Sequence, residues 1–484
     1  MEFSQYMWDL YKESSDGKKI IESFNITSEI DIEKHIGLYN KSLIKNAKFI
    51  ADISETIYCY NVSDYEPPAN FEEAIELYKS VIFSEINDSE VCIIDHGDYE
   101  MMLAANIAIS YALYVFSPEY YFPNLFKCNF LVLNRIVDNF GIELPSIPKK
   151  SDYKARCMYY MDLCKSFYDF RIKNNLSPPE LCAFLYDFAP KLVKQKETPI
   201  MPEPAQAWFI GGNLTKLDKK LGEIDFWQAN PETKKGDILV MYEKTPISAI
   251  TSIWRARVDG VIDPFFHFYS NTAITDEIQI PHISLTELKA DSYFSSHSLI
   301  RKNFQGVNGW QISSEDYSEL IRIIKKKEGK IEKLPKLYKP TIRKNISITC
   351  EKDVEKKLLE PFLQELGVSP NDYIRQLPIR AGRGSKIYPD YALFYDNTSG
   401  YEKAKVLIEA KYLMKNNKEI EECFKQARSY ANILESNTIV ICDMNYIMIY
   451  EKNEGFDRTN YCKYYWEEIE NPDKFREIKR KINK

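Results

Sequence analysis

Residues 388–411 read YPDYALFYDNTSGYEKAKVLIEAK, and this stretch decides the fold expected for the C-terminal part of the chain. It contains two apolar runs, at 391–394 and 406–408, that are typical of buried strands. Asp390 precedes the first run, and Glu409 and Lys411 end the second. Side chains two apart on a strand share a face, so Glu409 and Lys411 point the same way and Ala410 points the other way. If the strands are neighbours, Asp390 meets that pair at one end of a buried sheet.

Two carboxylates and an ammonium form a set that suits phosphodiester hydrolysis. This reaction needs a metal to neutralise the phosphate and to lower the pKa of the attacking water. Mg²⁺ takes hard oxygen ligands and keeps several waters, so Asp390, Glu409 and the carbonyl of Ala410 are the expected ligands, and Mn²⁺ is expected to substitute. Lys411 is a compact cation that can orient the nucleophile or stabilise developing charge. The sequence therefore predicts a Mg²⁺ site with a lysine beside it.

Two helices are expected to frame this site. The periodicity predicts a helix over 419–434, on which Gln426 and Tyr430 are four residues apart and share a face. An earlier helix over 353–366, ended by Gly367, carries Glu355 as a further carboxylate near the metal. The same residue types also form salt bridges on protein surfaces, and that alternative stays open here. Ionisable residues at the ends of buried strands nevertheless favour a functional site.

Residues 350–452 resemble the PD-(D/E)xK nuclease superfamily, and within it the N-terminal nuclease domain of type I restriction subunits. The matching residues are 355–363 (EKKLLEPFL), 382–383 (GR), 388–391 (YPDY), 408–411 (IEAK) and 426–431 (QARSYA). The resemblance implies a mixed β-sheet flanked by helices, Mg²⁺, and cleavage of DNA. It also implies that Asp390 and Glu409 are metal ligands, that Lys411 is the catalytic lysine, and that Gln426 and Tyr430 are an accessory pair.

The chain departs from type I subunits in one respect. Those subunits carry a helicase motor after the nuclease, whereas no G-x-x-x-x-G-K-[ST] motif occurs in this sequence. Translocation driven by ATP would therefore require a separate ATPase subunit. All five histidines precede the nuclease-like segment, which excludes histidine-dependent nuclease chemistry within it.

The middle of the chain is rich in short β runs and aromatic residues. Its runs at 207–210, 237–242 and 249–255 indicate a small β-barrel or sandwich over about 205–312. The segment resembles an EVE-type domain of the PUA-like superfamily through 208–212 (WFIGG), 226–227 (FW), 235–238 (KGDI), 253–256 (IWRA), 263–266 (DPFF) and 303–310 (NFQGVNGW). Several such domains bind DNA and accept a flipped modified cytosine in an aromatic pocket.

Flipped bases are recognised by stacking and by hydrogen bonds to the base edge. The expected stacking residues are Trp227, Trp254 and Phe268, and the expected edge contacts are Asp263 and Asn303. Aromatic residues in small β domains are also common core residues, and for each of them that alternative stays open.

The expected organisation has four parts: an all-α region at 1–197, a PUA-like β-barrel domain at 205–327, a basic linker at 328–347, and an α/β PD-(D/E)xK domain at 348–484. A proline-rich hinge at 199–204 follows the helical region. Residues 320–345 hold ten Lys or Arg against two acidic residues, which fits either a solvated linker or a strip that contacts phosphates.

Composition sets outer bounds on the function. The net charge of −7 gives no general indication of nucleic-acid binding. The ten cysteines form no C-x-x-C pair, the N-terminus lacks a signal-peptide pattern, and no run of 18 apolar residues occurs. We therefore expect a cytoplasmic protein with reduced thiols and no membrane partner.

Together these features predict a modification-dependent, type IV-like restriction endonuclease that acts on DNA carrying modified cytosine. Cleavage of both strands would favour a homodimer. One alternative is a phage-defence nuclease that cuts RNA or unmodified DNA while the middle domain senses another ligand. Another is a binding protein whose nuclease-like fold is catalytically idle.

Overall fold

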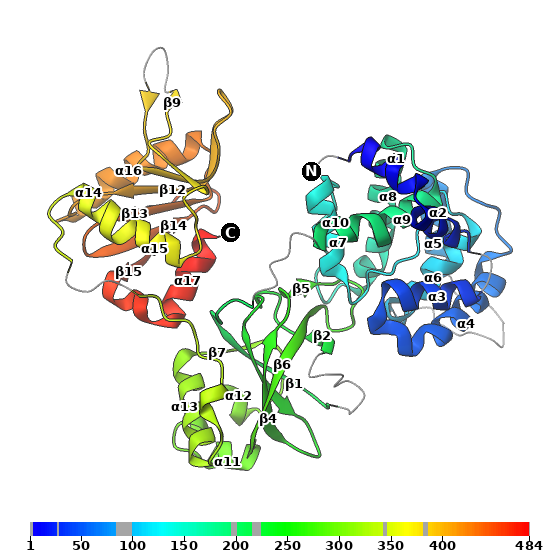
Figure 1. Cartoon of the computed structure of the whole chain (residues 1–484), viewed down its shortest axis with the longest axis horizontal. Helices are drawn as coiled ribbons and strands as arrows, with labels where there is room; N and C mark the ends of the chain where they lie inside the picture. Colours follow the sequence, from blue (N-terminus) through cyan, green and yellow to red (C-terminus); the bar gives the residue numbers. More distant parts are fainter. Residues whose placement is uncertain are drawn as a thin grey trace. The chain divides into compact units, whose positions relative to one another are not determined.

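The computed structural model describes residues 3–26, 29–83, 99–194, 201–214, 224–341, 346–380 and 386–483. The chain forms two compact units (Figure 1). The first unit comprises Met1–Pro202, Trp208–Gln311 and Ile324–Leu334, and the second comprises Glu203–Ala207, Ile312–Ile323 and Pro335–Lys484.

The N-terminal region of the first unit is helical, as expected. Its helices are α1 (Gln5–Glu13), α2 (Ser15–Ser23), α3 (Glu29–Tyr39), η1 (Lys41–Asn46), α4 (Ala47–Ile57), η2 (Tyr58–Val62), α5 (Phe71–Phe83), α6 (Tyr99–Phe116), α7 (Phe130–Phe140), α8 (Tyr153–Lys173), α9 (Pro178–Ala183), η3 (Phe184–Phe188) and α10 (Ala189–Lys194). Helix α9 begins with a full capping box formed by Ser177 and Glu180.

Helix α6 is the central helix of this region. Within the described residues it is the one helix long and apolar enough to cross a membrane by length and composition, but 61% of it is buried inside the protein. Tyr111, Leu113 and their neighbours pack in one core with residues from most of the other helices. Such burial is typical of the core helix of a globular domain.

The β part of the first unit is a curled, seven-stranded sheet. Its strands are β1 (Ala207–Gly212), β2 (Ile224–Gln228), β3 (Ile238–Glu243), β4 (Ala249–Ala256), β5 (Val261–Ile262), β6 (Ser270–Ser284) and β7 (Trp310–Ile312). They follow the order β2-β6-β4-β3-β1-β7, with β5 pairing β6. The long strand β6 pairs with β2, β4 and β5 through several register shifts, which curve it into a half-barrel. Short helices α11 (Leu285–Ala290), η4 (Phe294–Ser296) and α12 (Ser298–Arg301) follow β6.

The helical and β parts of this unit are joined by buried polar contacts. Arg156 on α8 is fully buried, and its guanidinium donates to the carbonyl oxygens of Pro264 and Phe266 at 2.9 and 2.8 Å. Phe265 packs in the same core as the helices. The loop after β5 is therefore fixed against the helical region.

The second unit is built around a six-stranded mixed sheet. Its strands β8 (Tyr373–Arg375), β11 (Tyr391–Asp396), β12 (Lys403–Ala410), β13 (Thr438–Cys442), β14 (Tyr446–Glu451) and β15 (Cys462–Tyr465) follow the order β15-β14-β13-β12-β11-β8. The pairing of β12 with β13 is parallel, and the other described pairings of this sheet are antiparallel. A separate hairpin pairs β9 (Ile379–Arg380) with β10 (Lys386–Ile387).

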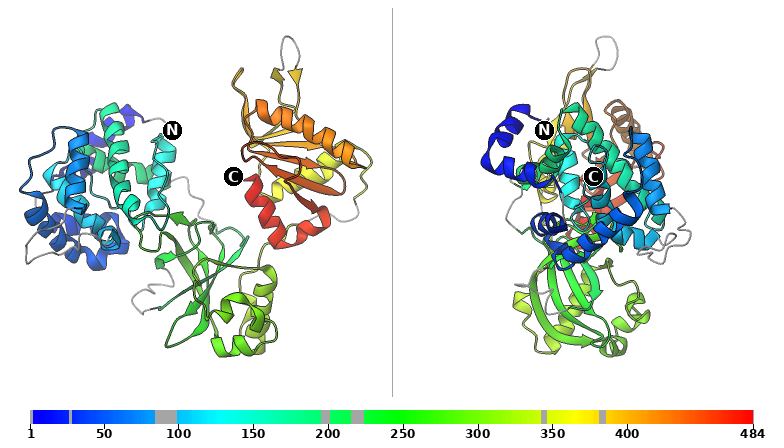
Figure 2. Two further views of the ribbon diagram at one scale, coloured as in Figure 1. Left: turned by 180° about the vertical axis from the view of Figure 1, so that it is seen from behind. Right: turned by 90° about the vertical axis from the view of Figure 1, so that its right-hand side faces the viewer.

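Helices cover both faces of this sheet (Figure 2). One face packs against α16 (Asn417–Ile433), and the other packs against η6 (Val354–Leu359), α15 (Glu360–Glu365) and α17 (Pro472–Ile482). Helices α14 (Glu351–Asp353) and η7 (Trp466–Glu470) also belong to this unit, whereas α13 (Ser314–Lys326) spans the boundary between the units and η5 (Ile331–Lys333) belongs to the first unit. A mixed sheet flanked by helices is the architecture that the sequence predicted for this part.

Candidate active site

The site residues expected from the sequence meet where β11 begins and β12 ends. The two strands are antiparallel neighbours, with Tyr391 opposite Ile408, so the condition set by the sequence is confirmed. The N–H of Ala410 donates to Oδ2 of Asp390 at 2.8 Å, which fixes the Asp390 carboxylate beside the end of β12. Ala410 packs in the core on the α15 face, as strand alternation requires, while Glu409 and Lys411 point to the opposite face.

Three acidic side chains converge at this strand end. Oxygens of Glu351, Glu355 and Asp390 all lie within 4.8 Å of one another. Glu351 begins α14, and Glu355 lies one turn later in η6, a π-helical segment of the same continuous helix. Such π segments often occur at functional sites. Asp390 and Glu355 were expected here, whereas Glu351 was missed, although its spacing of four from Glu355 places both on one helix face.

Glu409 is a buried carboxyl with an unsatisfied oxygen. It is fully buried, and within the described part of the chain its Oε1 has no hydrogen-bond partner. Burial, reinforced by the neighbouring Asp390 carboxylate, raises the pKa of Glu409 to about 8. A buried carboxylate without a full set of partners is costly, so a cation at this position would relieve the cost.

Lys411 is the cation of the cluster. Its Nζ lies 3.4 Å from Oε2 of Glu409 and 3.8 Å from Oδ2 of Asp390, and it donates to the carbonyl oxygen of Ala410 at 3.0 Å. Burial alone would lower the pKa of Lys411, but Asp390, Glu409 and Glu351 outweigh it and raise that pKa. The lysine therefore remains charged.

Glu355 is held in place by groups that the sequence analysis did not identify. Arg375 on β8 forms an ion pair with Glu355, and its guanidinium lies 5.3 Å from the ring centre of Tyr391. The Tyr391 hydroxyl donates to Glu360 at 2.9 Å and lies 3.4 Å from Glu355. This network orients the Glu355 carboxylate toward the cluster.

The accessory pair lies on α16. Gln426 Nε2 donates to the Tyr430 hydroxyl at 3.1 Å, which confirms that the two side chains share a face. Within the described residues neither side chain hydrogen-bonds to the acidic cluster. Cys423 lies one turn earlier on the helix and is buried. Burial raises the pKa of its thiol to about 12, and the charges of Lys411, Glu409 and Asp390 lie close enough to affect that pKa. The Gly382-Arg383 pair of the resemblance lies outside the described residues.

The donor set suits a hard divalent cation. All the candidate ligand atoms are carboxylate or carbonyl oxygens, as Mg²⁺ and Mn²⁺ require. The unsatisfied Oε1 of Glu409 adds an independent observation in favour of a cation. Asp390, Glu409 and the Ala410 carbonyl are thus joined by Glu351 and Glu355 as candidate ligands.

Of the five residues expected to line a base pocket, Trp254 and Asp263 are fully buried, Phe268 and Asn303 line one cavity, and Trp227 packs against the sheet core. Trp254 is fully buried with its indole N–H bonded to Ser252 at 2.8 Å, and Asp263 is fully buried with its oxygens on the backbone N–H groups of Cys128 and Phe265 at 2.6 and 2.9 Å. Both are structural in this fold, because neither presents a face or an oxygen to a ligand. We therefore correct the expected pocket by removing them.

Phe268 and Asn303, by contrast, line one cavity of about 630 Å³ in the first unit. Tyr242 and Phe304 also line it, and their rings stack at 3.9 Å. Trp227 is half-buried, packs against the sheet core and closely approaches Gly212, next to Gln228 on the cavity wall.

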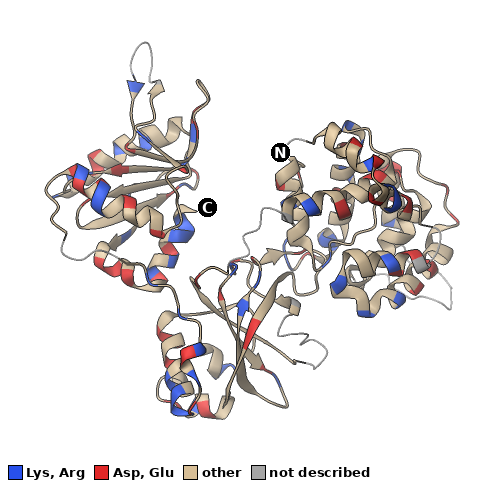
Figure 3. Ribbon diagram, viewed as in Figure 1, with Lys and Arg blue, Asp and Glu red and all other residues tan. Residues whose placement is uncertain are grey.

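The basic strip at 320–345 is partly neutralised. Figure 3 shows both charge signs along α13. Arg322 pairs with Glu319 at 2.5 Å, and Lys327 pairs with Glu287 at 2.5 Å. These ion pairs favour a solvated linker over a strip that contacts phosphates for this part of the segment. Residues 342–345 lie outside the described part of the chain.

Comparisons with known proteins found no matching protein family, no matching curated protein and no matching solved structure. The functional assignment therefore depends on the geometry and chemistry of the sites described above.

Proposed function

We propose that the second unit is a Mg²⁺-dependent endonuclease that hydrolyses DNA, and that the whole chain is a modification-dependent restriction endonuclease. The observation that carries the proposal is the juxtaposition of three carboxylates within 4.8 Å, the buried Glu409, and a lysine 3.8 Å from Asp390. Ion pairs on a protein surface rarely combine a buried unsatisfied carboxylate with several converging acids.

Each residue of the cluster has a proposed role. Asp390, Glu409, Glu351 and Glu355 hold the cation, together with the carbonyl of Ala410. When bound, Mg²⁺ would neutralise the scissile phosphate and lower the pKa of a bound water. Lys411 stays protonated beside the carboxylates, and its remaining N–H can donate to the phosphate or orient the nucleophile.

Supporting residues fix the geometry of this set. Arg375 and Tyr391 hold Glu355, so they are positioning residues rather than ligands. Gln426 and Tyr430 share the helix face that also carries the buried Cys423, and we propose that they contact the nucleic acid or the attacking water once DNA binds.

The proposed reader is the curled sheet of the first unit. Its 630 Å³ cavity combines an aromatic side chain that is 46% exposed, Phe268, with a polar one, Asn303. These two chemistries support stacking and edge recognition of an extruded modified cytosine. A reader in the same chain would raise the local concentration of the nuclease near its target without adding catalytic contacts.

The proposal is tested by incubating the full chain with Mg²⁺ and matched DNA that carries cytosine, 5-methylcytosine or 5-hydroxymethylcytosine. We expect cleavage of at least one modified substrate and little cleavage of plain DNA, with loss of activity in EDTA. Equal rates on all three would reject the modification claim and favour the alternative of a nuclease for unmodified DNA. Absence of cleavage on DNA, together with cleavage of RNA, would transfer the activity to the other nucleic acid.

A further inference from the structure

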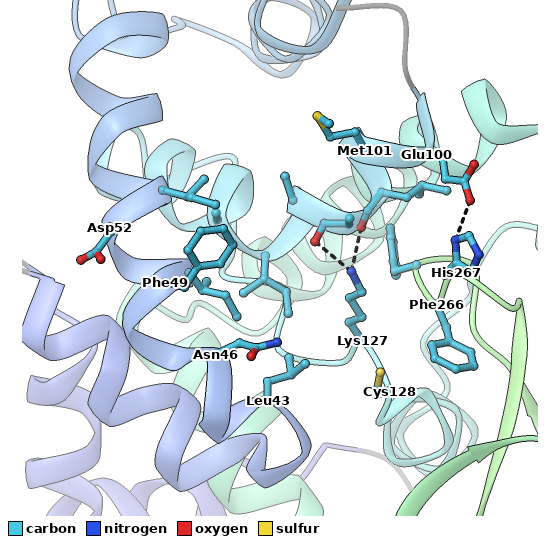
Figure 4. Close-up of a pocket in the computed structure, with 18 of the residues that line it drawn as sticks. Leu43, Asn46, Phe49, Asp52, Glu100, Met101, Lys127, Cys128, Phe266 and His267 are labelled. Atoms are coloured by element: carbon cyan, nitrogen blue, oxygen red, sulfur yellow. Dashed lines mark hydrogen bonds and ion pairs between the residues drawn. The ribbon is translucent and has the colours of Figure 1, made fainter. Parts of the chain in front are cut away.

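A large apolar pocket lies in the first unit, apart from the acidic cluster (Figure 4). Helices α4 and α6, the turn at 127–128 and the loop that follows β5 enclose about 750 Å³. That volume falls within the range of roughly 300–1,000 Å³ found for small-molecule sites. The walls are fixed in place, because Arg156 and Asp263 tie the loop after β5 to the helical region.

The lining is mostly apolar, and some of it is exposed to water. Phe49, Ile53, Met101, Ala105, Phe226 and Phe266 are among the apolar side chains that face the space. Phe49 is 66% exposed and Met101 is 42% exposed, although both line the pocket. A ligand with an apolar body would remove this surface from water, which is favourable.

One cation stands in the wall of this pocket. Lys127 extends toward α6, where its ammonium donates to the carbonyl oxygens of Leu103 and Ala104 at 2.9 Å each (Figure 4). An ammonium has three N–H donors. Within the described residues these two bonds leave the third donor for a ligand. Burial lowers the pKa of Lys127, so an anion beside it would be stabilising.

The acidic groups around the pocket do not compete for this lysine. Glu100 lies 2.7 Å from His267, and the two form a lip between α6 and the loop after β5. Asp52 is exposed, and Figure 4 shows its carboxylate directed away from Lys127. The charge of Asp263 opposes the lowering of the Lys127 pKa, but both oxygens of Asp263 already accept hydrogen bonds from backbone N–H groups.

We propose that this pocket binds a small apolar monoanion, an aliphatic or aromatic carboxylic acid, with its carboxylate on Lys127 and its apolar body among Phe49, Met101 and Phe266. This binding site is independent of the metal cluster. It stands whether the second unit cuts DNA or not.

Calorimetric titration of the full chain with octanoate, 2-naphthoate and neutral 1-octanol tests the proposal. We expect one octanoate per chain, and octanol at least about tenfold weaker, because a charged hydrogen bond is lost. Comparison of octanoate with 2-naphthoate distinguishes an aliphatic from an aromatic preference. Failure of both acids to bind at 1 mM, or equal affinity for octanoate and octanol, would overturn the proposal.

Variants locate the binding. Lys127→Met should reduce octanoate affinity about tenfold and leave octanol unchanged, whereas Lys48→Met, on the α4 helix but outside the pocket lining, should change neither. Ala104→Phe adds bulk at an exposed lining position, so it should fold normally and weaken both ligands. If Lys127→Met fails to fold, the Ala104→Phe result decides. Unchanged octanoate binding in folded Ala104→Phe, or in folded Lys127→Met, would contradict the assignment.

Discussion

Asp263 and Glu409 are both fully buried carboxyl groups, one in each unit, yet their surroundings differ. Both oxygens of Asp263 accept backbone N–H groups, from Cys128 and Phe265. Glu409 has one oxygen 3.4 Å from Lys411, and the other has no partner within the described residues. Burial raises both pKa values, that of Asp263 to about 6 and that of Glu409 to about 8.

This difference distinguishes a structural carboxyl group from a candidate metal ligand. Burial alone does not, because both groups are equally buried. The number of oxygens with hydrogen-bond partners does. Both oxygens of a structural carboxylate have partners within the folded chain, whereas a metal ligand has an oxygen without a partner in the chain. Asp390, whose charge helps to raise the pKa of Glu409, also belongs to the group formed with Glu351 and Glu355, so Glu409 lies beside other acidic side chains.

The largest expected effect is on cleavage. Lys411→Ala should lower the DNA cleavage rate by at least about 100-fold, the scale of losing one transition-state donor. Lys405, an exposed lysine on β12, the strand that Lys411 directly follows, provides the matched control, and Lys405→Ala should cleave as wild type does. Single-turnover cleavage with Mg²⁺ measures both. Wild-type rates in Lys411→Ala would mean that this lysine is not catalytic.

The second prediction concerns stability against pH without metal. A carboxyl whose pKa is higher in the folded than in the unfolded protein stabilises the fold when protonated. That contribution is full below the unfolded pKa and is lost as pH rises through the folded pKa. For Glu409 this stabilising contribution is lost between about pH 4.5 and about pH 8, and for Asp263 its loss is complete near pH 6.

Between pH 6 and 8, therefore, the second unit should lose thermal stability because of Glu409. Glu409→Gln should flatten that slope, and Mg²⁺ should raise the unfolding midpoint most at pH 8, where the carboxylate is free of its proton. Differential scanning calorimetry with EDTA or Mg²⁺ gives the curves. A wild-type slope that persists in Glu409→Gln would assign the proton to another group.

The third prediction concerns the structural role of Asp263. Asp263→Ala leaves the N–H groups of Cys128 and Phe265 without their acceptor, so it should destabilise the first unit by about 2–4 kcal/mol. Chemical denaturation measures this loss. The variant should keep wild-type Mg²⁺ affinity in the second unit, and an intact fold with impaired metal binding would contradict the structural role.

The smallest expected effect is at the proposed reader. Phe268→Ala should weaken binding to modified DNA by about 1–3 kcal/mol, the scale of one stacking contact. Phe268 is 46% exposed, so the fold should tolerate the change. Fluorescence anisotropy on modified and plain duplexes measures it. An equal loss on both duplexes would show that Phe268 contacts DNA without reading the modification.

Periodicity was sufficient to find most of the fold. The helix predicted over 419–434 is observed as α16, Asn417–Ile433, and the strands around Asp390 and Glu409 are neighbours as required. These elements follow local rules of spacing and capping, which a sequence displays directly.

Tertiary detail was harder to predict. A pattern of 3.6 residues per turn does not reveal that Glu355 lies in a π-helical segment. Arg375 reaches Glu355 from a strand twenty residues away in sequence. The sequence alone could not distinguish a core position from a pocket position for Trp254. The structure shows that its strand is buried along nearly its whole length.

A calorimetric titration of metal-free protein with Mn²⁺, in wild type, Glu409→Gln and Asp263→Asn, tests whether Glu409 binds a metal. Both substitutions replace a buried carboxyl by an amide of nearly the same size. We expect a Mn²⁺ site in wild type that is lost or weakened at least about tenfold in Glu409→Gln and retained in Asp263→Asn. Equal Mn²⁺ binding by wild type and folded Glu409→Gln, or no binding by wild type, would show that Glu409 is not a metal ligand.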